Sequence, residues 1–173
     1  MLINLSDVFR TRDKIEVVEI ACEMTEFQNG VQTYRIVSKE LSPFTFTNVE
    51  IDKAKINGEI DFIFQALCDR CAEEIPVNIK VNVERFVLSP RITTEDDQME
   101  SPFMDGYQID MEALIFHEIL ENWPMKILCK EDCKGVCPVC GQNLNVRECG
   151  CDRFIPDPRM MAIADILERN KEV

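Results

Sequence analysis

Two long segments in the first half of the chain, residues 51–67 and 75–88, alternate between apolar and polar side chains. A period of two residues is typical of strands in a half-buried antiparallel sheet. Residues 15–22 and 34–37 are shorter, apolar and rich in β-branched side chains, so we expect strands there as well. The first half of the chain therefore predicts an antiparallel sheet, with a hairpin between its two longest strands.

Apolar residues recur at helical spacing further along the chain. Residues 111–122 show this spacing, with Asp110 in position to cap the helix and Pro124 in position to end it. A second helix is predicted near the C-terminus, where Asp157 is an N-cap candidate and Pro158 occupies the first helical position. An apolar stripe follows on that helix, and such a stripe usually packs on the same protein.

The acidic charge is concentrated in one segment. The chain has 173 residues and a formal net charge of −13, and residues 91–123 hold nine acidic residues but one basic residue. Residues 93–100 lack hydrophobic periodicity and are predicted to be a solvated loop. The carboxylates of this loop are an expected landing surface for a basic partner, although a merely soluble linker has the same composition. They are Glu95, Asp96, Asp97 and Glu100.

Cysteines carry the most specific pattern. Eight of the nine form four local pairs, which are Cys68/Cys71, Cys129/Cys133, Cys137/Cys140 and Cys149/Cys151. Tetrahedral zinc needs four ligands, and thiolate sulfurs bound to one zinc lie about 3.8 Å apart. A C-x-x-C turn brings two sulfurs this close, and Gly141 lets the backbone leave such a turn at positive φ. The C-x-C spacing of the last pair requires a kink, which Gly150 can supply.

We expect these pairs to form two structural zinc sites. One uses the four cysteines from 137 to 151, and the other joins Cys68 and Cys71 to Cys129 and Cys133, with one helical turn predicted between the last two. A competing assignment moves Cys133 into the tail site and leaves Cys68 and Cys71 without metal. Cys22 follows an apolar run and is expected to be a buried, metal-free side chain.

Disulfides and a redox dithiol are the other interpretations of these cysteines. Residues 1–14 carry charges where a secretory signal needs an apolar core, so we expect a cytoplasmic protein with reduced thiols. No run approaches membrane-spanning length. A thioredoxin-like motif needs its C-x-x-C at a helix start, whereas both C-x-x-C motifs here lie in predicted turns.

Residues 133–145, Cys-Lys-Gly-Val-Cys-Pro-Val-Cys-Gly-Gln-Asn-Leu-Asn, strongly resemble the signature of the YceD family of bacterial proteins. The later Cys149-Gly150-Cys151, the Asp157-Pro158 helix start and the upstream C-x-x-C fit the same family, so the resemblance covers nearly the whole chain. The family is described as a factor needed for accumulation of large-subunit ribosomal RNA. The resemblance implies a role in large-subunit assembly, without a biochemical mechanism.

Two modes of action are compatible with this role. The first is binding of a basic ribosomal protein or another assembly factor by the acidic segment. The alternative is direct binding of rRNA by the zinc-held tail, for which the candidate contacts are Lys134, Arg147 and Arg153. The net charge opposes phosphate binding, which favours the first mode. An enzyme is not expected, because four thiolates close a zinc site that catalysis would need open.

The fold class predicted from these features is α+β. We expect a mainly antiparallel β body with an acidic loop and a helix over residues 1–123. A zinc-stabilised, cysteine-rich segment is expected over residues 124–173, ending in a short helix.

Overall fold

The computed structural model describes residues 1–40 and 42–152, which contacts divide into two compact units. The first unit comprises residues 1–67 and 74–127, and the second combines residues 68–73 with the chain from residue 128 onward. The sequence boundary was expected between residues 123 and 124. The predicted C-terminal helix and Arg153 lie outside the described residues.

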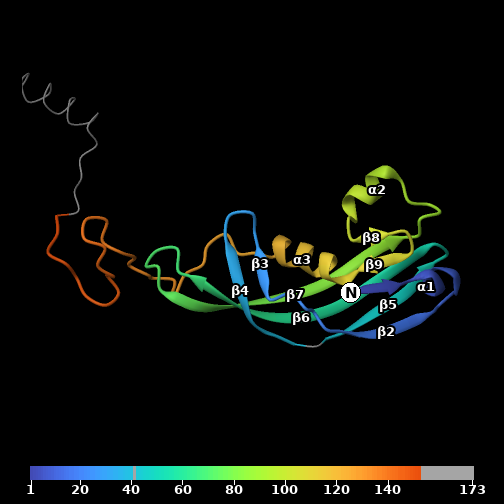
Figure 1. Ribbon diagram of the computed structural model, residues 1–173, viewed down its shortest axis with the longest axis horizontal. Helices are drawn as coiled ribbons and strands as arrows, with labels where there is room; N and C mark the ends of the chain where they lie inside the picture. The colour runs from blue at the N-terminus through green and yellow to red at the C-terminus, as the bar shows by residue number, and fades with distance from the viewer. Residues whose placement is uncertain (41, 153–173) are drawn as a thin grey trace, which may run out of the picture. The chain divides into compact units, whose positions relative to one another are not determined.

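Strands dominate the first unit (Figure 1). In chain order its elements are β1 (Leu2–Asn4), α1 (Ser6–Arg10), β2 (Ile15–Ile20), β3 (Glu26–Gln28), β4 (Thr33–Lys39), β5 (Ser42–Glu50), β6 (Lys53–Leu67), β7 (Glu74–Leu88), α2 (Glu95–Glu100), β8 (Met104–Asp105), β9 (Gln108–Asp110) and α3 (Met111–Glu121). All pairings between these strands are antiparallel. This confirms the predicted α+β class with a mainly antiparallel body.

Strand β6 organises the larger sheet. It pairs along its whole length with β7, from Lys53 opposite Leu88 to Leu67 opposite Glu74. Its other edge is shared by β5 near the start and β4 near the end, and β2 and β3 extend these two branches. The small strands β1, β9 and β8 form a separate three-stranded sheet. The predicted hairpin is therefore confirmed, and it is the longest pairing in the described chain.

The alternating pattern of these strands reflects burial on one face. The apolar residues at every second position of β6 and β7 belong to a core that also contains Phe44 and Phe46 from β5. Strand β5 was not predicted, because Pro43 interrupts its start and Asn48 its apolar alternation. The segment predicted to begin at residue 51 begins as β6 at Lys53, since Asp52 has a φ of +66° and belongs to the preceding turn.

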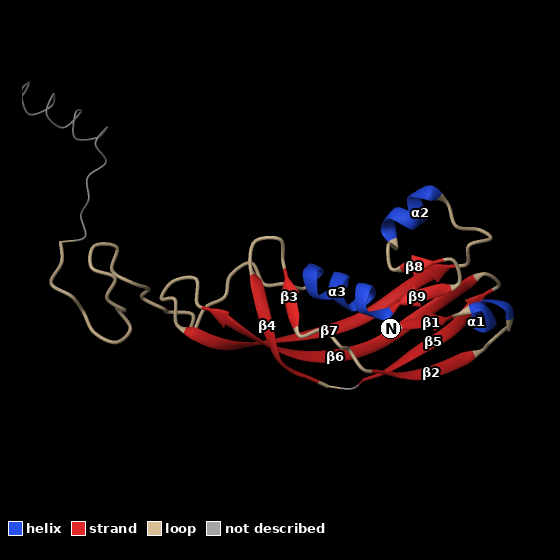
Figure 2. Ribbon diagram, viewed as in Figure 1, coloured by secondary structure: helices blue, strands red, loops and turns tan. Residues whose placement is uncertain are grey.

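Helix α3 lies against one face of the large sheet (Figure 2). Its predicted cap is confirmed: the Asp110 carboxylate accepts hydrogen bonds from the backbone N–H of Glu112, at 3.0 Å, and of Ala113. The buried carboxylate of Glu118 is paired with Arg85 of β7, 2.5 Å away. The described chain contains no helix with the length and apolar character that a membrane span requires.

The acidic segment is not the loop that was predicted. Residues Glu95–Glu100 form helix α2, because Thr94 and Asp97 make a reciprocal capping box. The backbone N–H of Thr94 donates to the Asp97 carboxylate at 2.8 Å, and that of Asp97 donates to the Thr94 hydroxyl at 3.3 Å. The Thr-x-x-Asp spacing was the sequence signal for this helix.

Candidate metal centres

The turn that joins β6 to β7 carries the first pair of cysteines. The backbone N–H of Cys68 donates to the carbonyl of Glu73, and that of Ala72 donates to the carbonyl of Cys68, both at 2.8 Å. These bonds fold residues 68–73 into a compact loop that turns both thiols to one side. Ala72 completes the loop in the left-handed region, with a φ of +57°.

Four sulfurs come together at this loop. We call Cys68, Cys71, Cys129 and Cys133 the hairpin cluster; their sulfurs all lie within 4.8 Å of one another. Cys68 is 3.8 Å from Cys133, and Cys71 is 3.6 Å from Cys129. These separations match the edge of about 3.8 Å expected for thiolates around one tetrahedral zinc.

The segment from Cys129 to Cys133 is a turn and not the predicted helical turn. Its defining bond runs from the Cys133 N–H to the carbonyl of Lys130, at 3.1 Å, which is an i to i+3 bond. The tight turn still brings both sulfurs to the cluster. The competing assignment of Cys133 to the tail site is not supported, because its sulfur lies with Cys68.

A second four-sulfur group lies within the tail. We call Cys137, Cys140, Cys149 and Cys151 the tail cluster; their sulfurs also lie within 4.8 Å of one another. The Cys137 N–H donates to the carbonyl of Gln142 at 2.9 Å, and the Gly141 N–H donates to the carbonyl of Cys137 at 2.8 Å. Gly141 has a φ of +72°, in the predicted left-handed conformation, whereas Gly150 is not among the positive-φ glycines.

The two C-x-x-C loops therefore repeat one backbone design. In each, the first cysteine donates to the carbonyl five residues later and accepts from the N–H four residues later. The residue four positions after the first cysteine has a positive φ in both loops. It is Ala72 in one loop and Gly141 in the other. This shared geometry is typical of zinc knuckles, in which backbone N–H groups and a metal ion organise the same short turn.

Three residues that the sequence reasoning did not select support the hairpin cluster. Arg70 donates to the carbonyl of Cys133 at 3.0 Å, and the amide of Asn145 donates to the Cys133 sulfur at 3.2 Å. Gly135 packs against the carbonyl of Arg70, where an added Cβ would lie 3.0 Å from the oxygen. Such outer contacts orient metal ligands. In the sequence, the only sign of these three residues is that they lie close to cysteines.

The thiols of each cluster differ in acidity. Burial opposes ionisation of Cys68, but N–H groups of Cys71, Arg70 and Cys129 outweigh it and lower the pKa to about 6. Backbone N–H groups of Cys140 and Val139 likewise lower the pKa of Cys137 to about 6. Each cluster thus has a thiol whose pKa is well below that of a free cysteine.

The opposite shift occurs at other members of the clusters. Burial, reinforced by the neighbouring thiols, raises the pKa of Cys129 to about 12. At Cys151 the contact with Cys140 is the larger cause and burial the second, and the pKa again rises to about 12. Four crowded thiols resist shared ionisation because like charges repel. A divalent cation at their centre removes that repulsion and stabilises all four thiolates.

This donor set fits zinc in a structural role. Four thiolates complete a tetrahedral shell and leave no position for a substrate or water, so each cluster is suited to holding the chain together. Cys22 lies apart and is 5% exposed, as predicted for a buried apolar side chain.

The remaining predicted site residues lie elsewhere. Glu95 and Asp96 are exposed on α2, whereas the Asp97 carboxylate is occupied by the capping box. Lys134 lies 3.7 Å from the carboxylate of Glu148. Arg147 donates to the side chain of Gln142 at 3.0 Å. The acidic and basic candidates therefore belong to different units of the chain.

Comparison with known proteins agrees with the cysteine pattern. Residues 56–167 match the family described as "Large ribosomal RNA subunit accumulation protein YceD". The chain belongs to the YceD family. The match spans both C-x-x-C loops and the whole tail cluster, so the two candidate metal centres lie in the part that relates this chain to the family.

One curated relative is a protein of Mycobacterium leprae (strain TN), described as "Uncharacterized protein ML1660". It is 30% identical over 104 residues, which cover 58% of this chain and 46% of the relative. The chain thus spans less than half the length of the curated relative that it matches. No solved structure matches the chain. The YceD family name describes a factor in large-subunit rRNA accumulation and names no catalytic activity.

Proposed function

We propose that this chain is a non-catalytic factor in assembly of the large ribosomal subunit, and that it binds a basic ribosomal protein or maturation factor through α2. The observation that carries the proposal is the charge of residues 91–123, with nine acidic residues and one basic residue. Helix α2 displays part of this charge in ordered form, since Glu95 and Asp96 are exposed within it. An acidic surface of this kind would attract a basic client and screen it from premature contact with RNA.

The zinc sites have a structural part in this proposal. The eight cysteines of the hairpin and tail clusters would hold two zinc ions and keep the second unit folded, since short segments rarely fold without such support. Neither ion would take part in chemistry.

A binding experiment tests the proposed partner class. Purified large-subunit ribosomal proteins are captured on the immobilised full-length chain across a range of salt concentrations. We expect selective capture of basic proteins, weakened by the triple variant Glu95→Gln, Asp96→Asn, Glu100→Gln. Asp97 is left intact, because its replacement would also remove the helix cap.

A charge-matched control separates a local surface from general acidity. The control variant is Glu19→Gln, Glu26→Gln, Glu50→Gln. It removes the same amount of negative charge from exposed positions on β2, β3 and β5. Equal loss in both variants would reduce the proposal to non-specific attraction, and unchanged capture by the α2 variant would remove it.

Direct rRNA binding by the tail is the weaker candidate. Lys134 faces Glu148, which offsets its charge locally, and Arg147 is engaged with Gln142. Nucleic-acid binding through these cations would have to displace both contacts. A salt-sensitive affinity for rRNA fragments that falls in the Lys134→Gln, Arg147→Gln variant would favour this candidate over protein binding.

A further inference from the structure

The outer face of the large sheet carries an aromatic side chain without a core role. Phe86 of β7 is 52% exposed, whereas its neighbour Val87 on the opposite face is 1% exposed. Successive side chains of a strand point to opposite faces, so Phe86 projects away from the core. A single exposed apolar side chain is common on protein surfaces, so it is the groups around the ring that indicate a binding role.

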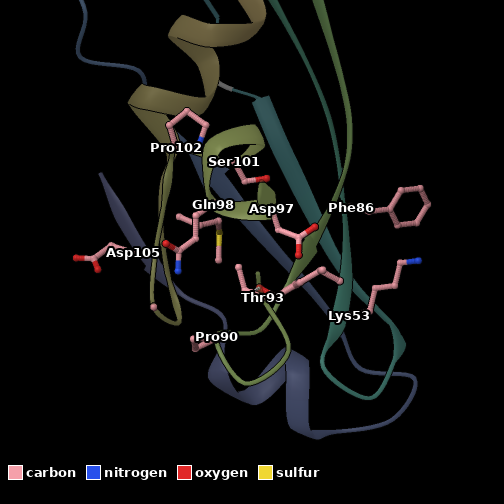
Figure 3. A pocket seen from close by; sticks show the side chains of 12 residues that line it. Lys53, Phe86, Pro90, Thr93, Asp97, Gln98, Ser101, Pro102 and Asp105 are labelled. Carbon is pink, nitrogen blue, oxygen red and sulfur yellow. Dashed lines mark hydrogen bonds between the residues drawn. The ribbon is translucent and has the colours of Figure 1, made fainter. Parts of the chain in front are cut away.

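Two lysines flank this ring. The ammonium groups of Lys53 and Lys55 lie 5.1 Å and 5.6 Å from its centroid. Lys55 is directly opposite Phe86 across the β6–β7 pair. Figure 3 shows the side chains of Phe86 and Lys53 projecting to the same side, away from Gln98 of α2.

The two lysines beside the ring differ in whether a carboxylate already pairs with them. Lys55 is paired with Glu84, at 2.6 Å. Within the described ranges no carboxylate pairs with Lys53, whose ammonium lies over the ring. The face therefore offers a positive group beside an exposed aromatic surface, within a protein that is otherwise strongly acidic.

Hydrogen-bonding side chains continue the same row across the sheet. Thr47 of β5 is opposite Lys55, and Thr45 is opposite Asn57. Both threonines are half-buried. Ile15 of β2, opposite Thr47, adds an exposed apolar surface at the end of the row.

This combination has a recognisable chemistry. An exposed aromatic ring stacks on an unpaired base of any sequence, and ammonium groups contact the adjoining phosphates. Short polar side chains on an open sheet can bond sugar hydroxyls and base edges. A purely apolar protein partner would use the ring but would have to desolvate both lysines, which is unfavourable.

We propose that this face, the outer platform formed by Lys53, Phe86, Thr45 and Thr47, binds unpaired nucleotides of single-stranded RNA, and that Lys55 contributes only when RNA displaces its pairing with Glu84. The platform contains no residue of α2 or of either cysteine cluster, and its Lys53 and Phe86 line one pocket together with Asp97 and Gln98 of α2 (Figure 3). With few lysines available, binding is confined to a short stretch of RNA and weakens as salt rises.

Fluorescence anisotropy with the full-length chain tests the platform. The probe is a labelled oligouridylate of about 12 nucleotides, compared with an RNA duplex of the same length, at about 50 mM salt. We expect the single strand to bind more tightly than the duplex. Phe86→Leu should weaken binding about tenfold, because it keeps apolar contact but removes the stacking ring. Phe86→Trp, which keeps a π face, should stay within about twofold of the parent.

Three controls make the result decisive. Thermal melting of Phe86→Leu should match the parent, as expected for an exposed position. Val31→Ala removes a different exposed apolar side chain and should leave RNA affinity unchanged. Lys53→Gln should lower both the affinity and the steepness of its salt dependence.

Four outcomes would overturn the proposal. They are absence of RNA binding by the parent chain, equal affinity for duplex and single strand, unchanged affinity in Phe86→Leu, and a loss confined to the Lys134→Gln, Arg147→Gln variant. If Phe86→Leu instead impairs capture of ribosomal proteins and leaves RNA affinity intact, the platform is a protein-docking face and the RNA proposal fails. The α2 variant reports on the proposed protein partner separately, so the two failures are distinguishable.

Discussion

The side-chain amide of Asn145 donates a hydrogen bond to the sulfur of Cys133, at 3.2 Å. This bond connects the loop of the tail cluster to a sulfur of the hairpin cluster, within the second unit. The same contact is the leading cause that lowers the pKa of the Cys133 thiol. Asn145 therefore stabilises the thiolate form that a metal ion requires.

Asn145→Ala should lower the zinc affinity of the hairpin cluster by roughly 10- to 100-fold, which is the usual effect of losing an outer contact to a metal ligand. Competition with a chromophoric chelator measures the affinity of each site. Arg147→Gln is the matched control, since the Arg147 side chain lies nearby and, within the described residues, donates to Gln142 and to no cysteine. Equal zinc affinity in Asn145→Ala and the parent would show that the bond does not act on the metal.

Elemental analysis of protein purified under reducing conditions should find two zinc ions per chain. Cys68→Ser, Cys71→Ser should retain one ion in the tail cluster, and Cys137→Ser, Cys140→Ser should retain one in the hairpin cluster. Chelation should expose the second unit to proteases before the β body, because the metal provides its folding energy. Loss of both ions in either variant would contradict two separate sites.

The matched turns offer a reciprocal test of backbone strain. Ala72 and Gly141 occupy the same left-handed position in the two loops. Ala72→Gly should stabilise the hairpin loop by about 0.5–1 kcal/mol, and Gly141→Ala should destabilise the tail loop by about the same amount, because the left-handed strain outweighs the entropy gained by replacing glycine. Zinc retention during stepwise chelation, followed for each site, measures both effects. Effects of the same sign in both variants would argue against the shared geometry.

The ring of Phe44 packs so closely on Gly58 of β6 that no side chain fits there. A Cβ added at Gly58 would lie 2.5 Å from two ring carbons of Phe44, which is fully buried. Gly58→Ala should therefore destabilise the body by about 1–3 kcal/mol, as overpacking does. Denaturant unfolding measures the loss. Phe44→Leu in the same background should recover part of it, whereas simple additivity of the two changes would show that they do not clash.

Helix α2 should weaken in acid. Hydrogen bonds from Thr94 hold the pKa of Asp97 below its usual value of 3.8. A lowered pKa means that the carboxylate form stabilises the folded helix fully above about pH 4, and that this stabilisation is lost as pH falls through the folded pKa. Amide signals of Thr94 and Asp97, followed by NMR, should shift together in that range. Asp97→Asn should remove the titration; persistence of it would assign the effect to another carboxylate.

Much of the body could be predicted from the sequence because its signals are local. The alternation in β6 and β7 can be recognised within each strand, and the Asp110 cap involves residues only two and three positions away. Strand β5 and its pairing with β2 were missed, since they depend on partners along the sheet and not on a strong period of their own. The α2 helix was missed for a different reason, because charge composition suggested a loop while Thr94 and Asp97 encoded a cap.

The cysteine pairs could be grouped from spacing, and the structure brings the same sets of four sulfurs together. Their supporting contacts could not be predicted. Arg70 is 63 residues from the carbonyl of Cys133 that it binds. No local pattern encodes such a pairing. The outer platform shows the same limit, because Lys53 and Phe86 meet only through the register of the hairpin.

The second unit is discontinuous along the chain, and this imposes an order of events during synthesis. Cys71 and its partner Cys129 are 58 residues apart, so the first two ligands leave the ribosome long before the other two. Until then the hairpin carries a free dithiol that can hold metal only incompletely. Closing a loop of this length costs roughly 4 kcal/mol of chain entropy, which a prefolded β body would largely remove. A metal ion at the hairpin cluster could therefore gain its full set of four thiolates only after the body and the start of the tail have been synthesised.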